Sequence, residues 1–167
     1  MTAITKDDKS PVTIADFAAQ ALVAHLLTTT LPGSVLVAEE SAGTLRGPEG
    51  QETLQTITKF VQTRIQKVTS EQVADLIDVG GAAPSDRFWT LDPIDGTKGF
   101  LRGDQYAVAL ALIEGGQVQI GVMACPNLTD GYIPEVGGAG SLIVAARGQG
   151  TWSANLTGAL DFTRLTV

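Results

Sequence analysis

The residues best suited to chemistry form one short stretch, Asp92-Pro93-Ile94-Asp95-Gly96-Thr97. Its two carboxylates stand three positions apart. Pro93 fixes its own φ angle and Gly96 permits a tight bend, so both carboxylates can turn toward one point. Magnesium prefers oxygen ligands in near-octahedral geometry and usually keeps several waters. Two aspartates, a backbone carbonyl and a nearby glutamate would therefore make a shared Mg²⁺ site.

The same stretch could also hold an anion beside the cation. If a helix begins after Asp95, the backbone amides of Gly96 and Thr97 lie at its N-terminus, where unpaired N–H groups and the macrodipole favour a phosphate. A phosphate next to metal ions suits metal-assisted hydrolysis, in which one cation activates a water and a second stabilises the leaving oxygen. The alternative is an ordinary turn, because Asp, Pro and Gly are all common turn residues.

The elements that must position these residues begin with a helix. Apolar side chains recur at three- and four-residue spacing over residues 13–31, which predicts an amphipathic helix. Residues 35–38 predict a short buried strand that delivers Glu39 and Glu40 at its carboxyl end. Further segments are expected in this order: a loop over 41–50, a helix over 51–68, and a helix capped by Ser70 that runs to about Val79.

The second half of the chain is expected to be mainly β. Residues 88–91 predict a strand that ends at Asp92. Two strands, over 106–113 and 117–124, flank a pair of glycines whose positive φ angles would form a tight hairpin. The pattern ends with a second hairpin, over 141–147 and 151–153, and with a last strand at 162–167. Helices early and strands late predict an α+β fold, with helices packed on a largely antiparallel β-sheet.

The composition limits the classes of function. The chain has 167 residues, 44% hydrophobic and 17% charged, which is typical of one globular domain. Its formal net charge of −7 argues against binding a nucleic acid polymer, because neutralising many phosphates takes clustered Lys and Arg. The longest apolar run, 106–113, is too short to span a membrane. A single cysteine, Cys125, and an N-terminus without a secretory signal predict a reducing, cytoplasmic setting.

Two sequence signatures resemble those of the inositol monophosphatase superfamily. They are the Asp92-Pro93-Ile94-Asp95-Gly96-Thr97 stretch and Glu39-Glu40-Ser41 after a strand. Within that superfamily, residues 5–13 and 98–103 are similar to the 3'(2'),5'-bisphosphate nucleotidases. The resemblance extends from about Thr5 to Arg164. It implies the N-terminal domain of the inositol monophosphatase-like fold and a magnesium-dependent phosphatase.

The resemblance also implies a ligand set and a reaction. Glu39, Asp92 and the carbonyl of Ile94 would bind one metal, and Asp92 and Asp95 another. The implied reaction removes the 3'-phosphate of 3'-phosphoadenosine 5'-phosphate to give AMP. Action on the sulfated relative of that nucleotide, and sensitivity to lithium or sodium, are implied in the same way.

Asp16 and Thr97 have implied catalytic roles, in which they orient and activate the attacking water. Each also has a plainer explanation. Asp16 stands three residues after Thr13 and could complete a capping box, and Thr97 could cap a helix. Glu40 is expected to be a solvated or outer carboxylate, because Glu39 occupies the implied ligand position and neighbouring strand residues face opposite ways.

The chain departs from the family pattern at its carboxyl side. Family members extend further there, and a second domain supplies another metal-binding aspartate in a Trp-Asp motif, whereas Trp152 is followed here by Ser153. We therefore expect a shortened form that keeps one metal-binding domain, residues 1–167, with a weaker second cation site and slower turnover. An exposed domain interface also predicts an apolar patch along the last strands, which would favour self-association.

Two alternatives to the nucleotidase follow from the same residues. The metal motif is shared across the superfamily, so the substrate could instead be an inositol phosphate or a sugar bisphosphate. Residues 98–103 favour the small nucleotide bisphosphate. The other alternative is a catalytically impaired fragment or subunit that binds metal or phosphate.

Overall fold

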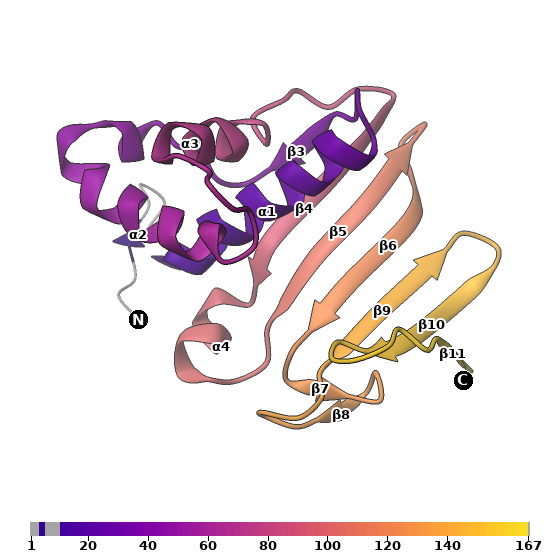
Figure 1. Ribbon diagram of the computed structural model, residues 1–167. Helices are drawn as coiled ribbons and strands as arrows, with labels where there is room; N and C mark the ends of the chain where they lie inside the picture. The colour runs from indigo at the N-terminus through magenta and orange to yellow at the C-terminus, as the bar shows by residue number, and fades with distance from the viewer. Residues whose placement is uncertain (1–3, 6–10, 167) are drawn as a thin grey trace.

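The computed structural model describes residues 4–5 and 11–166, so residues 6–10 of the segment at 5–13 lie outside the described part. Three helices, α1 (Ile14–Thr30), α2 (Gln51–Gln62) and α3 (Ser70–Asp78), gather at one end of the molecule, and a large sheet extends away from them (Figure 1). This arrangement confirms the predicted α+β fold with helices packed on a sheet.

The large sheet has seven strands and is mainly antiparallel. Its members are β3 (Leu36–Ala38), β4 (Arg87–Asp95), β5 (Ala107–Glu114), β6 (Gln117–Cys125), β9 (Ser141–Ala146), β10 (Gly150–Asn155) and β11 (Thr163–Leu165). They lie in the order β11-β10-β9-β6-β5-β4-β3. Only β3 and β4 run parallel among these neighbours. Two small sheets pair β1 (Ile4–Thr5) with β2 (Pro11–Val12) and β7 (Leu128–Thr129) with β8 (Ile133–Pro134).

Helix α1 is the central element of the core because it is covered on two sides. One cluster joins it to α2 and α3 through Phe17, Ala21, Ile57, Val61, Val73 and Ile77. A second cluster joins it to the sheet through Ala24, Leu27, Leu36 and Leu91. None of the helices within residues 11–166 has the length and apolar character needed to cross a bilayer.

Both predicted hairpins are confirmed. Gly115 and Gly116 connect β5 to β6 with φ angles of +56° and +71°. Positive φ at both central residues is characteristic of a type I′ turn, whose twist matches that of the flanking strands. The second hairpin joins β9 to β10 and pairs Val144 with Trp152.

Helix α2 is shorter than predicted, since it ends at Gln62 and not at residue 68. The Gln62 Nε2 donates a 2.9 Å hydrogen bond to the carbonyl of Val68, and Lys67 has a φ of +62°. Ile65 and Val68 still contact the core from this turn. The helical spacing of these residues therefore reflected their burial and not a continued helix, because residues in a turn can be buried equally well.

The start of α3 also differs from the prediction. Its N-cap is Thr69 and not Ser70, because Thr69 and Gln72 exchange the two hydrogen bonds of a capping box at 3.2 and 2.9 Å. The Ser70 hydroxyl instead forms a 3.0 Å hydrogen bond with the hydroxyl of Thr58 of α2. Residues 41–50, expected as a loop, contain two short 3-10 helices, η1 (Thr44–Arg46) and η2 (Pro48–Gly50).

Ile57→Ala is expected to destabilise the fold by about 2–5 kcal/mol, because it leaves a cavity between α1, α2 and α3. Ile57 is 0% exposed, whereas Phe60 on the same helix is 49% exposed and provides the control. Phe60→Ala should change stability by no more than about 0.5 kcal/mol. Equilibrium urea unfolding measures both, and equal losses would contradict the packing described above.

Candidate active site

A β-bulge in β4 brings the two aspartates of the motif to the same side of the sheet. The strand continues to Asp95, past the predicted end at Asp92, and its register with β5 shifts between them: Asp92 lies opposite Ala109 and Asp95 opposite Ala107. Residues three apart in a regular strand face opposite ways, and one inserted residue corrects this. Pro93 is fully buried at the bulge, where a missing N–H removes no ladder bond.

Three carboxylates influence the ionisation of a fourth, Asp92, at this end of β4. The pKa of Asp92 is raised, chiefly because the side chain is partly desolvated, and further by the negative charges of Asp95, Glu39 and Asp16. A backbone hydrogen bond involving Ile94 lowers the pKa and opposes these effects. The structure thus places the predicted side-chain ligands Glu39 and Asp95 and the predicted catalytic Asp16 within electrostatic range of Asp92.

Glu39 and Glu40 lie in different surroundings, as strand periodicity predicts. Glu39 is exposed, whereas Glu40 is only 5% exposed. Burial shows that the solvated alternative for Glu40 is wrong. The main chain of Glu40 is bonded to the side chain of Gln20, a residue that sequence analysis missed. The only feature of the sequence that pointed to Gln20 was its position one helical turn after Asp16, on the same face of the predicted helix.

Asp16 completes the N-terminal capping box of α1, so its plainer explanation is confirmed. The Asp16 Oδ2 accepts hydrogen bonds from the N–H and the hydroxyl of Thr13, both at 2.7 Å. Both residues are buried. The bonds fix the direction of the Asp16 carboxylate, whose charge still reaches Asp92. Its role in activating water stays a prediction.

A short helix, α4 (Thr97–Arg102), follows β4 directly, as the predicted phosphate site requires. Gly96 is its N-cap with a φ of +82°, and no described side chain caps it, so the capping explanation for Thr97 is wrong. The Thr97 hydroxyl donates instead to the carbonyl of Ile94 at 3.0 Å. That bond ties the start of α4 to the carbonyl predicted to bind metal. Phosphate contacts by Gly96 and Thr97 stay a prediction.

Two amide side chains that sequence analysis missed hold the loop after α4. The Asn127 Nδ2 donates to the carbonyl of Asp104 at 2.7 Å, and the Gln105 Nε2 donates to the carbonyl of Asn127. The Gln105 carbonyl is so close to α4 that a Cβ on Gly99 would lie 2.3 Å from it. A glycine inside a helix was the one sequence signal of this close contact.

The donor set is chemically suited to a hard divalent cation. Within residues 4–5 and 11–166, no group of three or more His, Cys, Asp or Glu side chains is already arranged to hold a metal ion. The negative charges of Asp95, Glu39 and Asp16 nevertheless act on the Asp92 carboxylate. A cation relieves the repulsion between like charges, and carboxylate and carbonyl oxygens are the ligands that Mg²⁺ prefers.

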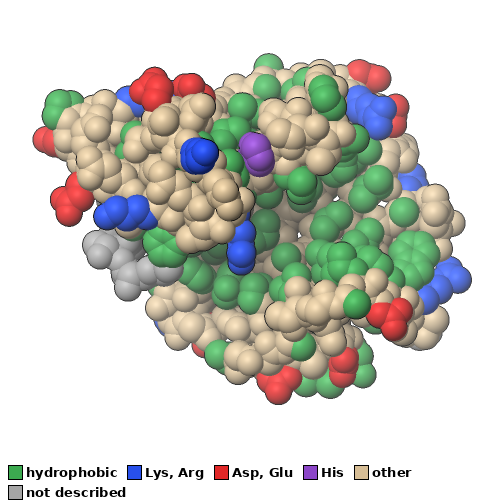
Figure 2. Space-filling view, viewed as in Figure 1, with side chains coloured by type: hydrophobic (Ala, Val, Ile, Leu, Met, Phe, Trp, Pro, Cys, Tyr) green, Lys and Arg blue, Asp and Glu red, His purple; other side chains and the backbone are tan. Residues whose placement is uncertain are grey.

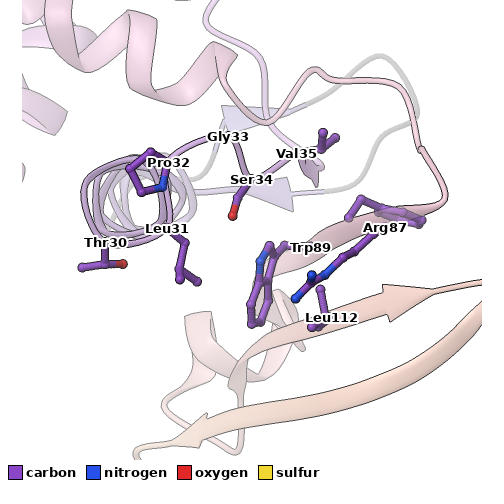
Figure 3. Close-up of a pocket in the computed structure, with 10 residues that line it drawn as sticks. Thr30, Leu31, Pro32, Gly33, Ser34, Val35, Arg87, Trp89 and Leu112 are labelled. Atoms are coloured by element: carbon purple, nitrogen blue, oxygen red, sulfur yellow. The ribbon is translucent and has the colours of Figure 1, made fainter.

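A pocket of about 420 Å³ lies at the opposite end of β4 (Figure 3). Leu31 and Ser34 line it from the end of α1 and the following loop, Arg87 and Trp89 from β4, and Leu112 from β5. At about 3.3 Å per strand residue, the two ends of β4 lie roughly 25 Å apart. None of the four carboxylates lines this pocket.

A family comparison assigns the fold. The sequence model of the protein family described as "Inositol monophosphatase family" matches residues 2–164 of the chain. The chain belongs to the inositol monophosphatase family. The membership that the two signatures implied is thereby confirmed.

Curated relatives within the family carry nucleotidase names. The chain is 44% identical to "3'(2'),5'-bisphosphate nucleotidase 2" of Candida albicans over 92% of the chain and 47% of the relative. It is 43% identical to the Schizosaccharomyces pombe "3'(2'),5'-bisphosphate nucleotidase" with the same coverages of 92% and 47%. The Arabidopsis thaliana "3'(2'),5'-bisphosphate nucleotidase 1" is 48% identical over 74% of the chain and 38% of the relative. The chain spans about half the length of these relatives or less.

Solved structures share the fold at lower identity. A Staphylococcal inositol monophosphatase-1 in a LiCl-soaked inhibitory complex has a TM-score of 0.54 and 21% identity, over 92% of this chain and 41% of that one. An IMPase/NADP phosphatase complexed with Mg²⁺ and phosphate has a TM-score of 0.52 and 21% identity, with the same coverages of 92% and 41%. These similarities confirm the inositol monophosphatase fold.

Asp92→Asn is expected to stabilise the metal-free chain at pH 7 by ~0.5 kcal/mol, because it removes one of several neighbouring negative charges. The pKa of Asp92 is higher in the folded chain than in the unfolded chain. The stability that the Asp92 side chain contributes is therefore complete below its unfolded pKa and is lost as pH rises through its folded pKa. The gain should therefore disappear in acid. Urea unfolding with a chelator, at pH 7 and in acid, measures the change in stability. The same change at the exposed Asp161, Asp161→Asn, is the control. A gain of equal size in acid would contradict this account.

Proposed function

We propose that residues 1–167 form a single metal-binding domain of a magnesium-dependent phosphatase, and that this phosphatase is a 3'(2'),5'-bisphosphate nucleotidase. The observation that carries the proposal is the negative charge of Asp95, Glu39 and Asp16 around Asp92, whose pKa is raised by partial desolvation and by these charges. Acidic groups held together in this way suit the binding of a hard cation. Relatives at 43–48% identity that bear the nucleotidase name support the substrate class.

The carboxylates and one carbonyl are the proposed ligands of two Mg²⁺ ions. Glu39, Asp92 and the carbonyl of Ile94 would hold the first, and Asp92 and Asp95 the second. The Mg²⁺ named with a solved structure of the same fold supports a divalent cation. When bound, the cations supply a water of lowered pKa and positive charge at the leaving oxygen.

Asp16 and Thr97 are proposed to orient the attacking water. The Asp16 carboxylate is fixed by two hydrogen bonds from Thr13, so it can accept a proton from water without first reorganising. Thr97 is fixed by its bond to the Ile94 carbonyl. Both side chains are thus held in place before the substrate arrives, which favours positioned general-base catalysis.

The start of α4 is proposed to bind the phosphate that is removed. Gly96 has a positive φ and lacks a side chain, so the main-chain amides of Gly96 and Thr97 can approach an anion closely. Amides at a helix start donate to phosphate oxygens and carry the positive end of the helix dipole. Gly96 and Thr97 follow Asp95 directly at the start of α4, which supports an anion site next to the two aspartates.

The proposed reaction is hydrolysis of the 3'-phosphate ester of 3'-phosphoadenosine 5'-phosphate. Water attacks phosphorus, the bond between phosphorus and the 3' oxygen breaks, and that oxygen takes up a proton, leaving AMP and phosphate. The sulfated relative of the nucleotide presents the same ester. Solved relatives named for inositol phosphates are about 21% identical, so the nucleotide is favoured over an inositol phosphate or sugar bisphosphate. A cytoplasmic location stays a prediction.

Phosphate release from 3'-phosphoadenosine 5'-phosphate is expected to require both Mg²⁺ and Asp92. In Asp92→Ala, release and Mg²⁺ affinity should each fall by at least about 100-fold, because losing even an outer partner of a metal ligand lowers affinity roughly 10–100-fold. Release is measured with Mg²⁺, with a chelator and with LiCl, which should inhibit. Calorimetry gives the Mg²⁺ affinity, and Asp161→Ala is the matched control.

Each outcome of that experiment separates the functions considered. Mg²⁺ binding that depends on Asp92 without any release would favour the metal-binding fragment or subunit. Release from inositol 1-phosphate but not from the nucleotide would change the substrate class. Absence of both Mg²⁺ binding and phosphate release would overturn the proposed function.

We also propose that the chain self-associates with a second copy through the far end of its sheet. Val144, Trp152 and Phe162 line a shallow apolar hollow of about 290 Å³ there, and Phe162 is 43% exposed. Figure 2 shows hydrophobic side chains gathered over this part of the molecule. The adjoining β11 is the last strand in the sheet order, and an edge strand of this kind can pair with another strand.

Phe162→Glu is expected to weaken self-association by about tenfold, because it places a charge in the apolar contact. Phe60→Glu, at an exposed position on α2, should leave the association unchanged. Sedimentation velocity over a range of concentrations measures both. A clean monomer of the unsubstituted chain at high concentration would contradict this proposal.

A further inference from the structure

Gln20 is a fully buried amide in α1 that bonds to the main chain beside Glu39. Its Nε2 donates to the carbonyls of Glu40 and Ile77, both at 2.7 Å. Its Oε1 accepts a 2.9 Å hydrogen bond from the N–H of Glu40. One side chain therefore joins α1, the end of β3 and the end of α3, and satisfies both main-chain groups of Glu40 as a neighbouring strand would.

These bonds fix the main chain of Glu39 from its carboxyl side. The N–H of Glu40 belongs to the peptide that Glu39 and Glu40 share, so the bond to Gln20 holds the plane of that peptide. From the amino side, Ala38 pairs with Leu91 of β4, and its N–H donates to the carbonyl of Gly80 at 2.8 Å. The Glu39 side chain is exposed and extends from this fixed stretch of main chain.

Two side chains on the same face of α1, Asp16 and Gln20, bear on the carboxylates. Asp16 and Gln20 are four residues apart and both are buried, so they lie one helical turn from each other on the inner face. Asp16 places a negative charge close enough to affect Asp92, and Gln20 anchors the chain next to Glu39. The same helix thereby carries one of the acidic groups and anchors the chain beside another.

We propose that Gln20 is a positioning residue of the cation site, which holds the Glu39–Glu40 peptide so that the Glu39 carboxylate stays beside Asp92 and Asp95. The part of this inference that concerns cations rests on the proposed function. The part that concerns the peptide rests on the hydrogen bonds alone.

Gly80 provides the space in which the Gln20 amide lies. A Cβ at Gly80 would lie 2.6 Å from the Gln20 Nε2 and 2.8 Å from the Cβ of Ala38. Gly80→Ala would therefore displace the amide without removing it. This gives a second way to test the same bonds, and it remains usable if a substitution of Gln20 itself prevents folding.

The experiment compares Gln20→Leu, which keeps the approximate size but no hydrogen bond, with Thr58→Val as a matched control. Thr58 is also buried, and its hydroxyl donates to the Leu54 carbonyl at 2.7 Å and lies within hydrogen-bond distance of the Ser70 hydroxyl, at 3.0 Å, within the helical layer. Amide hydrogen exchange at Glu40, followed by NMR, reports on the peptide without any metal. Calorimetry with Mg²⁺ reports on the cation site.

We expect exchange at Glu40 to accelerate at least about tenfold, and Mg²⁺ affinity to fall at least about tenfold, in Gln20→Leu and Gly80→Ala but not in Thr58→Val. Unchanged exchange at Glu40 in both site variants would overturn the inference. Faster exchange with unchanged Mg²⁺ affinity would overturn the role at the cation site while leaving the proposed function intact. If the unsubstituted chain binds no Mg²⁺, the proposed function fails, and the exchange rates alone decide whether Gln20 holds the peptide.

Discussion

The partly desolvated carboxylate of Asp92, with further negative charge around it at the end of β4, is the constraint on which the rest of the site depends. Asp92 has a raised pKa because it is partly desolvated and because Asp95, Glu39 and Asp16 place negative charge nearby. Acidic groups in an unrestrained chain would separate, since each gains by returning to water. The fold opposes that separation by fixing the main chain around each acid, and the same arrangement suits the acids to a cation.

Helix α1 supplies much of that restraint because it is packed on both sides. Its contacts with α2 and α3 and with the sheet leave it little freedom to shift. The capping bonds of Thr13 and the amide of Gln20 then transfer this rigidity to Asp16 and to the chain at Glu40. The bulge with its buried Pro93 does the same for the two aspartates of β4. Core packing and site geometry are therefore coupled through a few hydrogen bonds.

Local patterns predicted the elements well where burial and secondary structure agreed. The helix at Ile14–Thr30 and the hairpin at Gly115 and Gly116 lie where the spacing and the glycines placed them. The prediction failed where burial continued beyond an element, as at Val68, which contacts the core from a turn. It also failed at Thr97, whose hydroxyl bonds to the Ile94 carbonyl, because both a cap and this contact suit a threonine beside a helix start.

The sequence by itself determined the family and the α+β fold and indicated the acids proposed as ligands, because the Asp92 to Thr97 stretch and the Glu39-Glu40 pair are recognisable without knowing their neighbours. Only the tertiary structure decided that Asp92 and Asp95 share one side of β4, since that depends on a register shift against β5. It alone revealed Gln20, whose partners at Glu40 and Ile77 lie 20 and 57 residues away. Hydrogen bonds between distant segments leave no local pattern, because the chain between them can have almost any sequence that folds.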